Sequence, residues 1–226
     1  MNATIVIPQR GQSRLTLQCL RTFRKHHGDS ARIVVVDDGS PVDELRAIGN
    51  CECRNLELLV RSAEGVTAAW NAGARETRTE FLVFLNNDTT TSAPWLARLL
   101  SPLAAGRAVV CGVAARIENA VSESVLRRLP TRRFAEGWCF AVRRLDFEAV
   151  GGFDPSLRTY FSDTDIQARL LDAAGATNRC IATVGCEGIE HLGHATARLD
   201  SRRRALWQSD RLRFAALWNR RTRFAA

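Results

Sequence analysis

Several features that mark common protein classes are missing from this 226-residue sequence. No CxxC pair occurs among its seven cysteines, and an odd count without a signal peptide argues against a disulfide framework. No apolar run approaches the roughly 18 residues that cross a bilayer. Internal repeats and low-complexity linkers are absent too. We therefore expect neither a transmembrane helix nor a repeat array nor a disulfide-stapled secreted domain, and we predict a reduced, soluble, cytoplasmic protein.

Excess charge is scarce outside the C-terminal tail. The net charge is +8, from 32 Lys and Arg against 24 Asp and Glu, and the residues from Arg198 onward hold nine Arg and two Asp. The tail, residues 197–226, thus carries +7 of this charge, and the body is near neutral. The length and the 46% hydrophobic content suit one large globular domain with a sizeable core.

The first 110 residues alternate between two kinds of segment. Short apolar runs rich in β-branched residues, typical of buried strands, lie at residues 4–8, 32–37, 56–60 and 81–85. Segments of helical length lie at residues 15–27, 66–75 and 94–103. This alternation predicts βαβ units and an α/β fold in which helices flank a mostly parallel sheet.

Two of the predicted strands end on polar side chains. FLVFL runs straight into Asn86, Asn87 and Asp88, and IVVV runs into Asp37 and Asp38. Asp, Gly and Ser also favour ordinary turns, so one such strand end alone would be weak evidence. Open parallel sheets bind ligands beyond the carboxyl ends of their strands, and two acid-bearing ends on one edge favour a site there.

The second half of the chain has a different rhythm. We expect strands at residues 137–142 and 180–184, a short helix at 143–150, a Gly-rich turn at 151–155 and a helix at 163–175. Ser162 and Asp165 match an S-x-x-D capping box at the start of that last helix, which would explain both without any function. The capping box leaves Asp163 unexplained.

In chain order, the landmarks resemble those of the inverting, GT-A-fold glycosyltransferases of family 2. They are TIVIP with LTLQCL, VVVDDGS, WNAG, FLVFLNNDT, GWCFAVRR, GGFD, SDTDIQARL and HLGH, and they run from about Thr4 to His194. The resemblance implies a GT-A-like catalytic domain at residues 1–196, with a nucleotide-sugar-binding half (1–110) and an acceptor-side half (111–196). The tail, 197–226, would follow as a basic amphipathic helix.

For the donor, the resemblance implies contacts along the predicted sheet edge. In the family, the acid after the second strand meets the base or the ribose, which here is Asp38. Relatives often carry an aromatic residue and an Asn after the Pro of the first strand, whereas this chain has Gln9, Arg10 and Gly11. The implied donor-binding residues are Pro8, Arg10, Asp37, Asp38, Arg61, Asn71, Asn86 and Asn87.

A metal ion and a catalytic base are also implied. The family's D-x-D position is Asn86-Asn87-Asp88 here, so Asp88 keeps the only carboxylate, and His191 is the second candidate ligand. Mg²⁺ or Mn²⁺ can use one or two protein carboxylates when phosphate oxygens and water complete the shell. Asp163 aligns with the catalytic carboxylate and is the expected general base. The implied acceptor-side residues are Trp138, Gly152, Asp165 and His194.

The resemblance implies a metal-dependent, inverting, hexosyltransferase-like enzyme. It would move a sugar from a UDP, GDP or dTDP sugar to a hydroxyl of a saccharide or lipid-linked acceptor, in cell-surface polysaccharide or glycoconjugate synthesis. Two alternatives stay open. One is a sugar nucleotidyltransferase, which usually opens with a Gly-rich basic phosphate loop. The other is a non-catalytic nucleotide-sugar-binding protein in which the NND and SDTD segments are relics.

The tail combines arginines with an apolar stripe at helical spacing, formed by Leu199, Leu206, Trp207, Phe214, Leu217 and Trp218. The stripe could dock on the catalytic domain or on a second subunit, as in a homodimer. A basic amphipathic helix could also lie on anionic lipid at the inner membrane face. Nucleic acid is the third partner considered, but no reader motif accompanies the charge. We favour docking for the apolar side and membrane or lipid-linked acceptor contact for the arginines, and we expect no specific nucleic acid.

Overall fold

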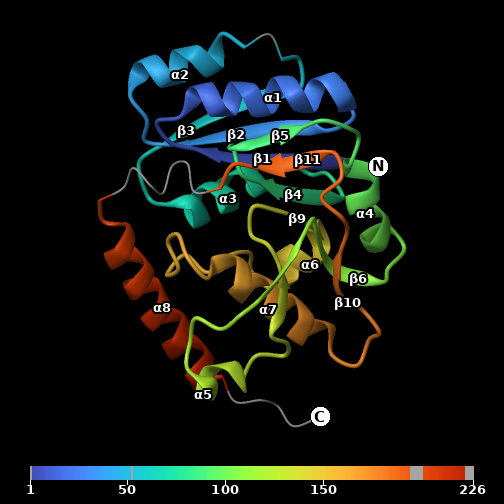
Figure 1. Ribbon diagram of the computed structural model, residues 1–226, viewed down its shortest axis with the longest axis vertical. Helices are drawn as coiled ribbons and strands as arrows, with labels where there is room; N and C mark the ends of the chain where they lie inside the picture. The colour runs from blue at the N-terminus through green and yellow to red at the C-terminus, as the bar shows by residue number, and fades with distance from the viewer. Residues whose placement is uncertain (1, 52, 194–200, 222–226) are drawn as a thin grey trace.

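A seven-stranded sheet forms the centre of the computed structural model, which describes residues 2–51, 53–193 and 201–221 (Figure 1). From one edge to the other, the strands are β10 (Cys180–Thr183), β6 (Ala108–Gly112), β9 (Cys139–Arg143), β4 (Phe81–Leu85), β1 (Ala3–Gln9), β2 (Arg32–Asp38) and β3 (Leu56–Arg61). Two small antiparallel sheets pair β5 (Thr89–Thr91) with β11 (Ile189–His191) and β7 (Ala115–Ile117) with β8 (Arg133–Ala135).

The main sheet is mostly parallel, as the sequence predicts. β4, β1, β2 and β3 run parallel to one another, and β10 is parallel to β6. Only β9 is antiparallel to its neighbours, and it lies between β4 and β6. The carboxyl ends of β1, β2 and β4 therefore meet at one edge, where the polar side chains that follow FLVFL and IVVV come together.

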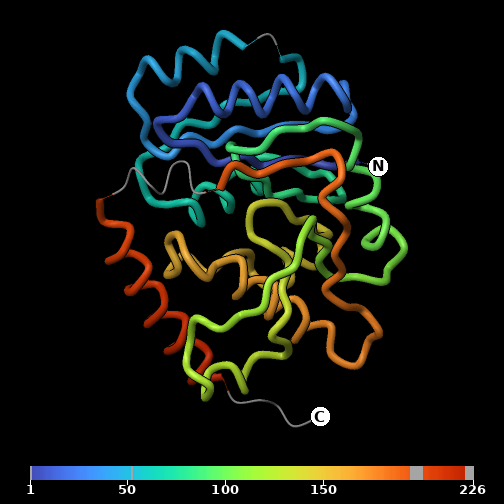
Figure 2. The backbone as a smooth tube through the Cα atoms, in the orientation of Figure 1, coloured from blue at the N-terminus to red at the C-terminus, as the bar shows by residue number. Residues whose placement is uncertain are grey.

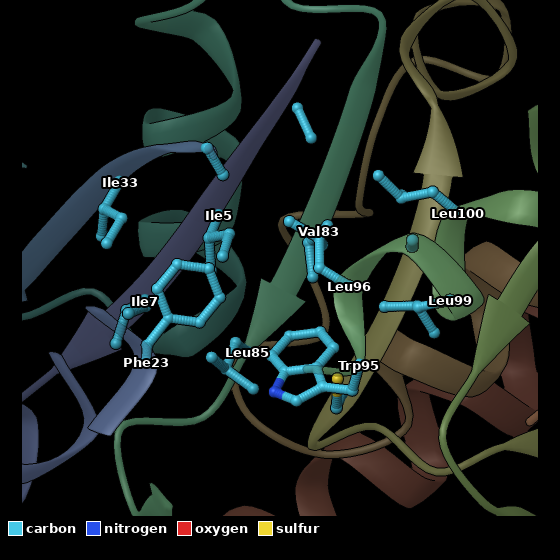
Figure 3. Close-up of a cluster of buried hydrophobic side chains, with 14 of the residues drawn as sticks. Ile5, Ile7, Phe23, Ile33, Val83, Leu85, Trp95, Leu96, Leu99 and Leu100 are labelled. Carbon is cyan, nitrogen blue, oxygen red and sulfur yellow. The ribbon is translucent and has the colours of Figure 1, made fainter. Parts of the chain in front are cut away.

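Helices cover both faces of the sheet (Figure 1). They are α1 (Ser13–His27), α2 (Val42–Gly49), α3 (Val66–Arg75), α4 (Leu96–Ala104), α5 (Glu123–Leu126), α6 (Arg144–Ala149), α7 (Ser162–Ala174) and α8 (Arg203–Arg220). Alternate strand residues point to opposite faces. Ile5 and Val83 pack with Phe23 of α1 and Leu99 of α4 (Figure 3), and the opposite face packs against α3 and α7.

Most predicted elements lie where the sequence places them. The structure confirms residues 66–75 and 81–85 as α3 and β4, with the same bounds, and the other predicted strands and helices differ by a few residues. Seven regular elements were not predicted, since each is brief or has no clear period: α2, α5, β5, β6, β7, β8 and β11. His191, expected in a loop, ends strand β11 instead.

The tail helix docks on the rest of the protein, as favoured for its apolar side. Phe214 and Trp218 of α8 are buried in a cluster with Phe134, Leu157 and Phe161. Leu206, Trp207 and Leu217 of the predicted stripe are half-buried. Leu199 and residues 197–200 and 222–226 of the predicted tail lie outside the described residues.

Two further expectations concern the cysteines and the membrane. All seven cysteines have free thiols. Among residues 2–51, 53–193 and 201–221, no helix combines the length and the apolar character that crossing a membrane requires.

Gly73 marks the closest approach of α3 to the sheet. A Cβ atom at this position would lie 2.4 Å from Val6 Cγ1 and 2.9 Å from Val36 Cγ2. Because a packed core cannot yield this space, we expect Gly73→Ala to lower the free energy of unfolding by about 1–3 kcal/mol. Gly49→Ala is the matched control, since a Cβ there meets nothing within 4 Å. Denaturant unfolding checks both, and equal stability of the two variants would contradict the close approach.

His27 makes the stability of the fold depend on pH. Its ring stacks on Phe23 at 4.4 Å, and Nε2 accepts the backbone N–H of Trp95 at 3.3 Å. Burial, with a smaller effect of His26, lowers the pKa of His27 from 6.5 to about 4. Between these values the unfolded chain binds a proton that the folded chain does not, so stability is lost as pH falls from 6.5 toward 4.

The test compares urea unfolding of the wild type and His27→Leu near neutral pH and at a pH inside that window. The variant should lose less stability than the wild type on acidification. An identical loss in both proteins would show that His27 does not contribute.

Candidate active site

One cavity of about 1040 Å³ opens at the carboxyl edge of β1, β2 and β4. Asp38, Asp88 and Asp163, which come from three separate segments of the chain, all line it. Its walls are completed by residues from β7, the loop before α7, β11 and the start of α8. The three carboxylates therefore line one cavity, and the roles expected of them stay predictions.

The two acids that follow IVVV have different roles. Asp38 faces the cavity, and its carboxylate accepts the backbone N–H groups of Glu64, at 2.7 Å, and Gly65, at 3.0 Å. Asp37 is fully buried, and it accepts hydrogen bonds from the Gln9 amide and from backbone N–H groups of the turn that follows it. Asp37 therefore holds the turn that presents Asp38, and it is absent from the cavity lining.

The other predicted donor-binding residues divide in the same way. Pro8 and Arg10 line the cavity at the end of β1. Arg61 lies outside the lining, 3.4 Å from the Glu64 carboxylate. Asn71 also lies outside it, because its amide exchanges two hydrogen bonds, at 2.9 and 3.0 Å, with the backbone of Phe153. Arg61 and Asn71 thus shape neighbouring segments and do not face the cavity.

Asn86, Asn87 and Asp88 lie in the cavity wall beside His191. Pairing of β11 with β5 sets His191 opposite Thr89, which brings His191 Nε2 to 3.0 Å from Asp88 Oδ1. The Asn86 amide is 3.4 Å from the same nitrogen, while the buried Asn87 amide donates to Thr16 Oγ1 at 3.0 Å. Figure 1 shows β11 (orange) beside β5 (green).

Trp138 shapes this part of the site through His191. The two rings stack at 4.9 Å with an interplanar angle of 15°. Trp138 is half-buried, lines the cavity and packs against the core, so its indole fixes the plane of the imidazole. Trp138 was expected on the acceptor side, and the structure shows that it also contacts His191, the predicted metal ligand.

The donor set around Asp88 fits a divalent ion with few protein ligands. Two adjacent ligands of an octahedral ion, each bonded at about 2.1 Å, are about 3 Å apart, and Asp88 Oδ1 and His191 Nε2 have that separation, 3.0 Å. Within the described residues, no group of three or more His, Cys, Asp and Glu side chains converges. An ion held here would therefore need phosphate oxygens or water to complete its shell.

Asp163 lies in the first turn of α7 and faces the cavity. Its Oδ2 accepts a hydrogen bond from Arg116 Nη2 at 2.8 Å, and Arg116 Nη1 is 2.9 Å from the buried Glu118 carboxylate. The Asp163 carboxylate is the main cause of the raised pKa of Arg116. Gly137 packs on the same carboxylate, since a Cβ there would lie 2.5 Å from Oδ2. A guanidinium and a glycine backbone thus fix Asp163 in the wall.

The predicted capping box is wrong. The residue before α7 is Phe161, which adopts a left-handed φ of 63°, and no side chain caps the helix. Asp165 is buried and bonds instead to Arg169 Nε at 2.7 Å and to Trp218 Nε1 at 3.1 Å. Burial raises its pKa, and Arg169 opposes this. Asp165 thus pairs with Arg169, one turn further along α7, and accepts a hydrogen bond from Trp218 of α8, so it does not cap the helix.

Two further acceptor-side predictions need correction or cannot be placed. Like Asp165, Gly152 does not line the cavity, because it packs between the Asn71 amide and the Phe147 ring. Its φ of 72° and the close contacts explain the glycine structurally. His194 lies outside the described residues.

Sequence reasoning missed several residues of the cavity wall. Arg116 and Glu118 come from the short strand β7 and the residue after it, where no pattern marked them. Arg203 and Trp207 line the cavity from the start of α8. A signal existed for these two: with Asp210 they share one face of the tail helix, at spacings of four and three.

Comparison with known proteins identifies the family. Residues 4–166 match the family model described as Glycosyl transferase family 2. The chain belongs to glycosyltransferase family 2. The match includes Asp38, Asp88 and Asp163, and it ends within α7.

Among curated proteins, the chain is similar to the "Pre-mycofactocin glycosyltransferase" of Mycobacterium tuberculosis. The two are 28% identical over an alignment of 196 positions, and the match covers 76% of this chain and 39% of that protein. The chain therefore spans about two fifths of the length of this relative.

Solved glycosyltransferases share the fold of this family 2 chain. The mannosyltransferase PcManGT from Pyrobaculum calidifontis, in complex with GDP-Man and Mn²⁺, has a TM-score of 0.67 and 20% identity, and the match covers 98% of this chain and 65% of that one. GalNAc-T7, with UDP, GalNAc and Mn²⁺, has a TM-score of 0.66 and 18% identity over 84% of this chain and 44% of that one. The predicted GT-A-type fold is confirmed.

Proposed function

We propose that this family 2 chain transfers a sugar from a nucleoside-diphosphate sugar to an acceptor hydroxyl with inversion at the anomeric carbon. The observation that supports this most is the shared cavity of Asp38, Asp88 and Asp163. These acids supply the three functions that the reaction needs: a contact for the nucleoside, a ligand for a cation at the diphosphate, and a base for the acceptor.

The donor would lie along the ends of β1, β2 and β4. Asp38 is held by two backbone N–H groups and turns toward the cavity, where it suits the hydroxyls of a ribose or the edge of a base. Pro8, Arg10, Asn86 and Asn87 line the same region. UDP, GDP and dTDP sugars are the candidate donors, and structural neighbours were solved with UDP or GDP-Man.

Asp88 and His191 would hold Mg²⁺ or Mn²⁺ at the diphosphate. Their 3.0 Å separation suits adjacent ligands of one ion. When bound, such an ion offsets the negative charge that develops on the departing diphosphate. Trp138, stacked on the imidazole, keeps His191 turned toward Asp88.

Asp163 would act as the general base. Arg116 engages Oδ2, so Oδ1 is the oxygen that can take the proton of the acceptor hydroxyl. As that proton moves to Asp163, the hydroxyl oxygen forms a bond to the anomeric carbon from the face opposite the diphosphate. The bond from that carbon to the diphosphate oxygen breaks, and the nucleotide leaves with the electron pair.

The acceptor side of the cavity combines flat apolar groups with cations. Tyr160, Trp207 and Ile117 line it together with Arg158 and Arg203. In the part of the chain that the structure describes, Arg158 and Arg203 form no ion pair. Aromatic faces suit sugar rings and isoprenoid or other apolar groups, and unpaired arginines suit phosphate.

The residues of this wall suit a saccharide or a lipid-linked acceptor. An acceptor of this kind would give the enzyme a role in polysaccharide or glycoconjugate synthesis. Peripheral contact with the inner membrane face through the arginines of the tail would suit a lipid-linked acceptor. That contact, a cytoplasmic location and a homodimer all stay predictions.

A panel of nucleotides and nucleotide sugars with Mn²⁺ tests the proposal. Thermal shift would report binding, and release of free nucleotide would report turnover, with and without acceptor. We expect one nucleotide class to raise the melting temperature, because a ligand at about 100 times its Kd adds about 2.7 kcal/mol of stability. Nucleotide release should require an acceptor. Binding without release from any donor or acceptor would favour a non-catalytic binding protein, and no binding at all would contradict the proposal.

A further inference from the structure

Asp210 is a fully buried carboxylate in the tail helix α8, remote in sequence from the catalytic domain's motifs. It accepts the backbone N–H groups of Thr159 and Tyr160, each at 2.9 Å, and that of Arg158 at 3.4 Å. Arg213, one turn along α8, is 3.5 Å away. Three consecutive amides thus point at one carboxylate, which satisfies a buried charge without a close ion pair.

The segment that Asp210 holds leads directly to the proposed base. Residues 158–160 line the cavity, and Phe161, Ser162 and Asp163 follow. Figure 2 shows this segment (gold) beside α8 (red). A shift of residues 158–160 would therefore move the start of α7 and the carboxylate of Asp163.

The turn at Phe161 needs external support. With a φ of 63°, Phe161 is the one non-glycine residue with a left-handed backbone in the described part of the chain. A bulky residue keeps this conformation only where the surroundings hold it there. These surroundings come from α8: the Phe161 ring stacks on Phe214 at 5.3 Å and lies 6.0 Å from Trp207.

A hydrogen bond also joins α8 to the first turn of α7. Trp218 Nε1 donates to Asp165 Oδ1 at 3.1 Å, and both side chains are buried. Asp165 lies two residues after Asp163, so the turn that carries the base is held on both sides by the tail helix. The hydrogen bond from Arg116 then orients the Asp163 carboxylate itself.

We propose that Asp210 is a positioning residue for catalysis, and that α8 is part of the active-site scaffold. The inference rests on the proposed function, in which Asp163 is the base. Without the carboxylate, three backbone N–H groups lose their acceptor, and the segment that leads into the left-handed turn loses the contact that holds it. Catalytic groups must be placed closely, since a misplacement of about 1 Å can lower the rate by about 100-fold.

The test compares four full-length proteins: wild type, Asp210→Asn, Trp218→Phe and the control Gln208→Ala. In Asp210→Asn the amide nitrogen repels some of the backbone donors, and Trp218→Phe removes one hydrogen bond but keeps the aromatic packing. Gln208 is exposed on α8 and lies outside the cavity lining. For each protein, kcat, the KM for donor, nucleotide affinity and hydrogen exchange at residues 158–161 are measured.

We expect Asp210→Asn to lower kcat by about 10–100-fold and Trp218→Phe to lower it by a few-fold. Donor KM and nucleotide affinity should stay within about twofold of wild type, and amide exchange at Thr159 and Tyr160 should rise. Gln208→Ala should match wild type throughout. A merely structural role would instead lower the active fraction and leave the kcat of the folded enzyme unchanged.

Unchanged kcat in folded Asp210→Asn would overturn the inference, and so would unchanged kcat in Trp218→Phe if Asp210→Asn does not fold. In both cases an inactive Asp163→Asn would show that the proposed function still holds. If Asp163→Asn transfers sugar as well as wild type, Asp163 is not the base, and both the proposed mechanism and this inference fail.

Discussion

Asp163→Asn is expected to lower kcat for sugar transfer by about 10²–10⁴-fold and to leave nucleotide affinity within about twofold of wild type. The substitution keeps the size of the side chain and an oxygen that can accept from Arg116, so the wall of the cavity should be preserved. What it removes is the oxygen that can take a proton from the acceptor hydroxyl. The proposed nucleotide contacts come from other segments of the chain, at the ends of β1, β2 and β4.

Asp172→Asn is the matched control, because Asp172 lies on the exposed side of the same helix α7. Calorimetry with the nucleotide and steady-state kinetics would be run on both variants. Turnover of Asp163→Asn close to that of wild type would remove Asp163 from the role of base. A large loss of nucleotide affinity would show that Asp163 serves the donor instead.

Loss of the divalent cation, or of its carboxylate ligand, has the second largest expected effect. A chelator should reduce transfer to background, and Mn²⁺ or Mg²⁺ should restore it, because the departing diphosphate otherwise carries its charge unshielded. Asp88→Ala should lower kcat/KM by at least about 100-fold, because it removes the carboxylate of the pair that Asp88 forms with His191.

A readout independent of activity separates metal binding from other damage. Titration of Mn²⁺ followed by electron paramagnetic resonance, in the presence of nucleotide, should show binding to wild type and much weaker binding to Asp88→Ala and His191→Ala. His26→Ala on α1, outside the cavity lining, is the control histidine. Full transfer activity in excess chelator would contradict a metal-assisted reaction in this chain.

The sheet and the polar residues at the carboxyl ends of its strands could be predicted, because strand patterns depend on residues that are close in the sequence. Strand β4 is five buried apolar residues in a row, and its carboxyl end had to meet those of β1 and β2 once the strands were parallel. This rule placed Asp38 and Asp88 at the edge, and the family resemblance then supplied the roles expected of them. The resemblance also suggested His191, which lies beside Asp88 because β11 pairs with β5.

Long-range contacts explain what the sequence did not reveal. Nothing local distinguishes Asp37 from Asp38, and only the fold shows that the first bonds to Gln9 and the second faces the cavity. Asn71 was assigned to the donor because the family motif contains it, yet its amide bonds to Phe153, 82 residues away. Asp210 carried no motif at all, since its partners are backbone amides about 50 residues earlier.

The most direct measurement is a crystal structure of Asp163→Asn with the nucleotide sugar that the panel selects and Mn²⁺. We expect the nucleoside at Asp38 and the diphosphate on an ion bound by Asp88 and His191. The face of the anomeric carbon opposite the diphosphate should point toward position 163 and the wall of Tyr160 and Trp207. A nucleotide bound elsewhere, or a sugar whose diphosphate side faces position 163, would contradict the account.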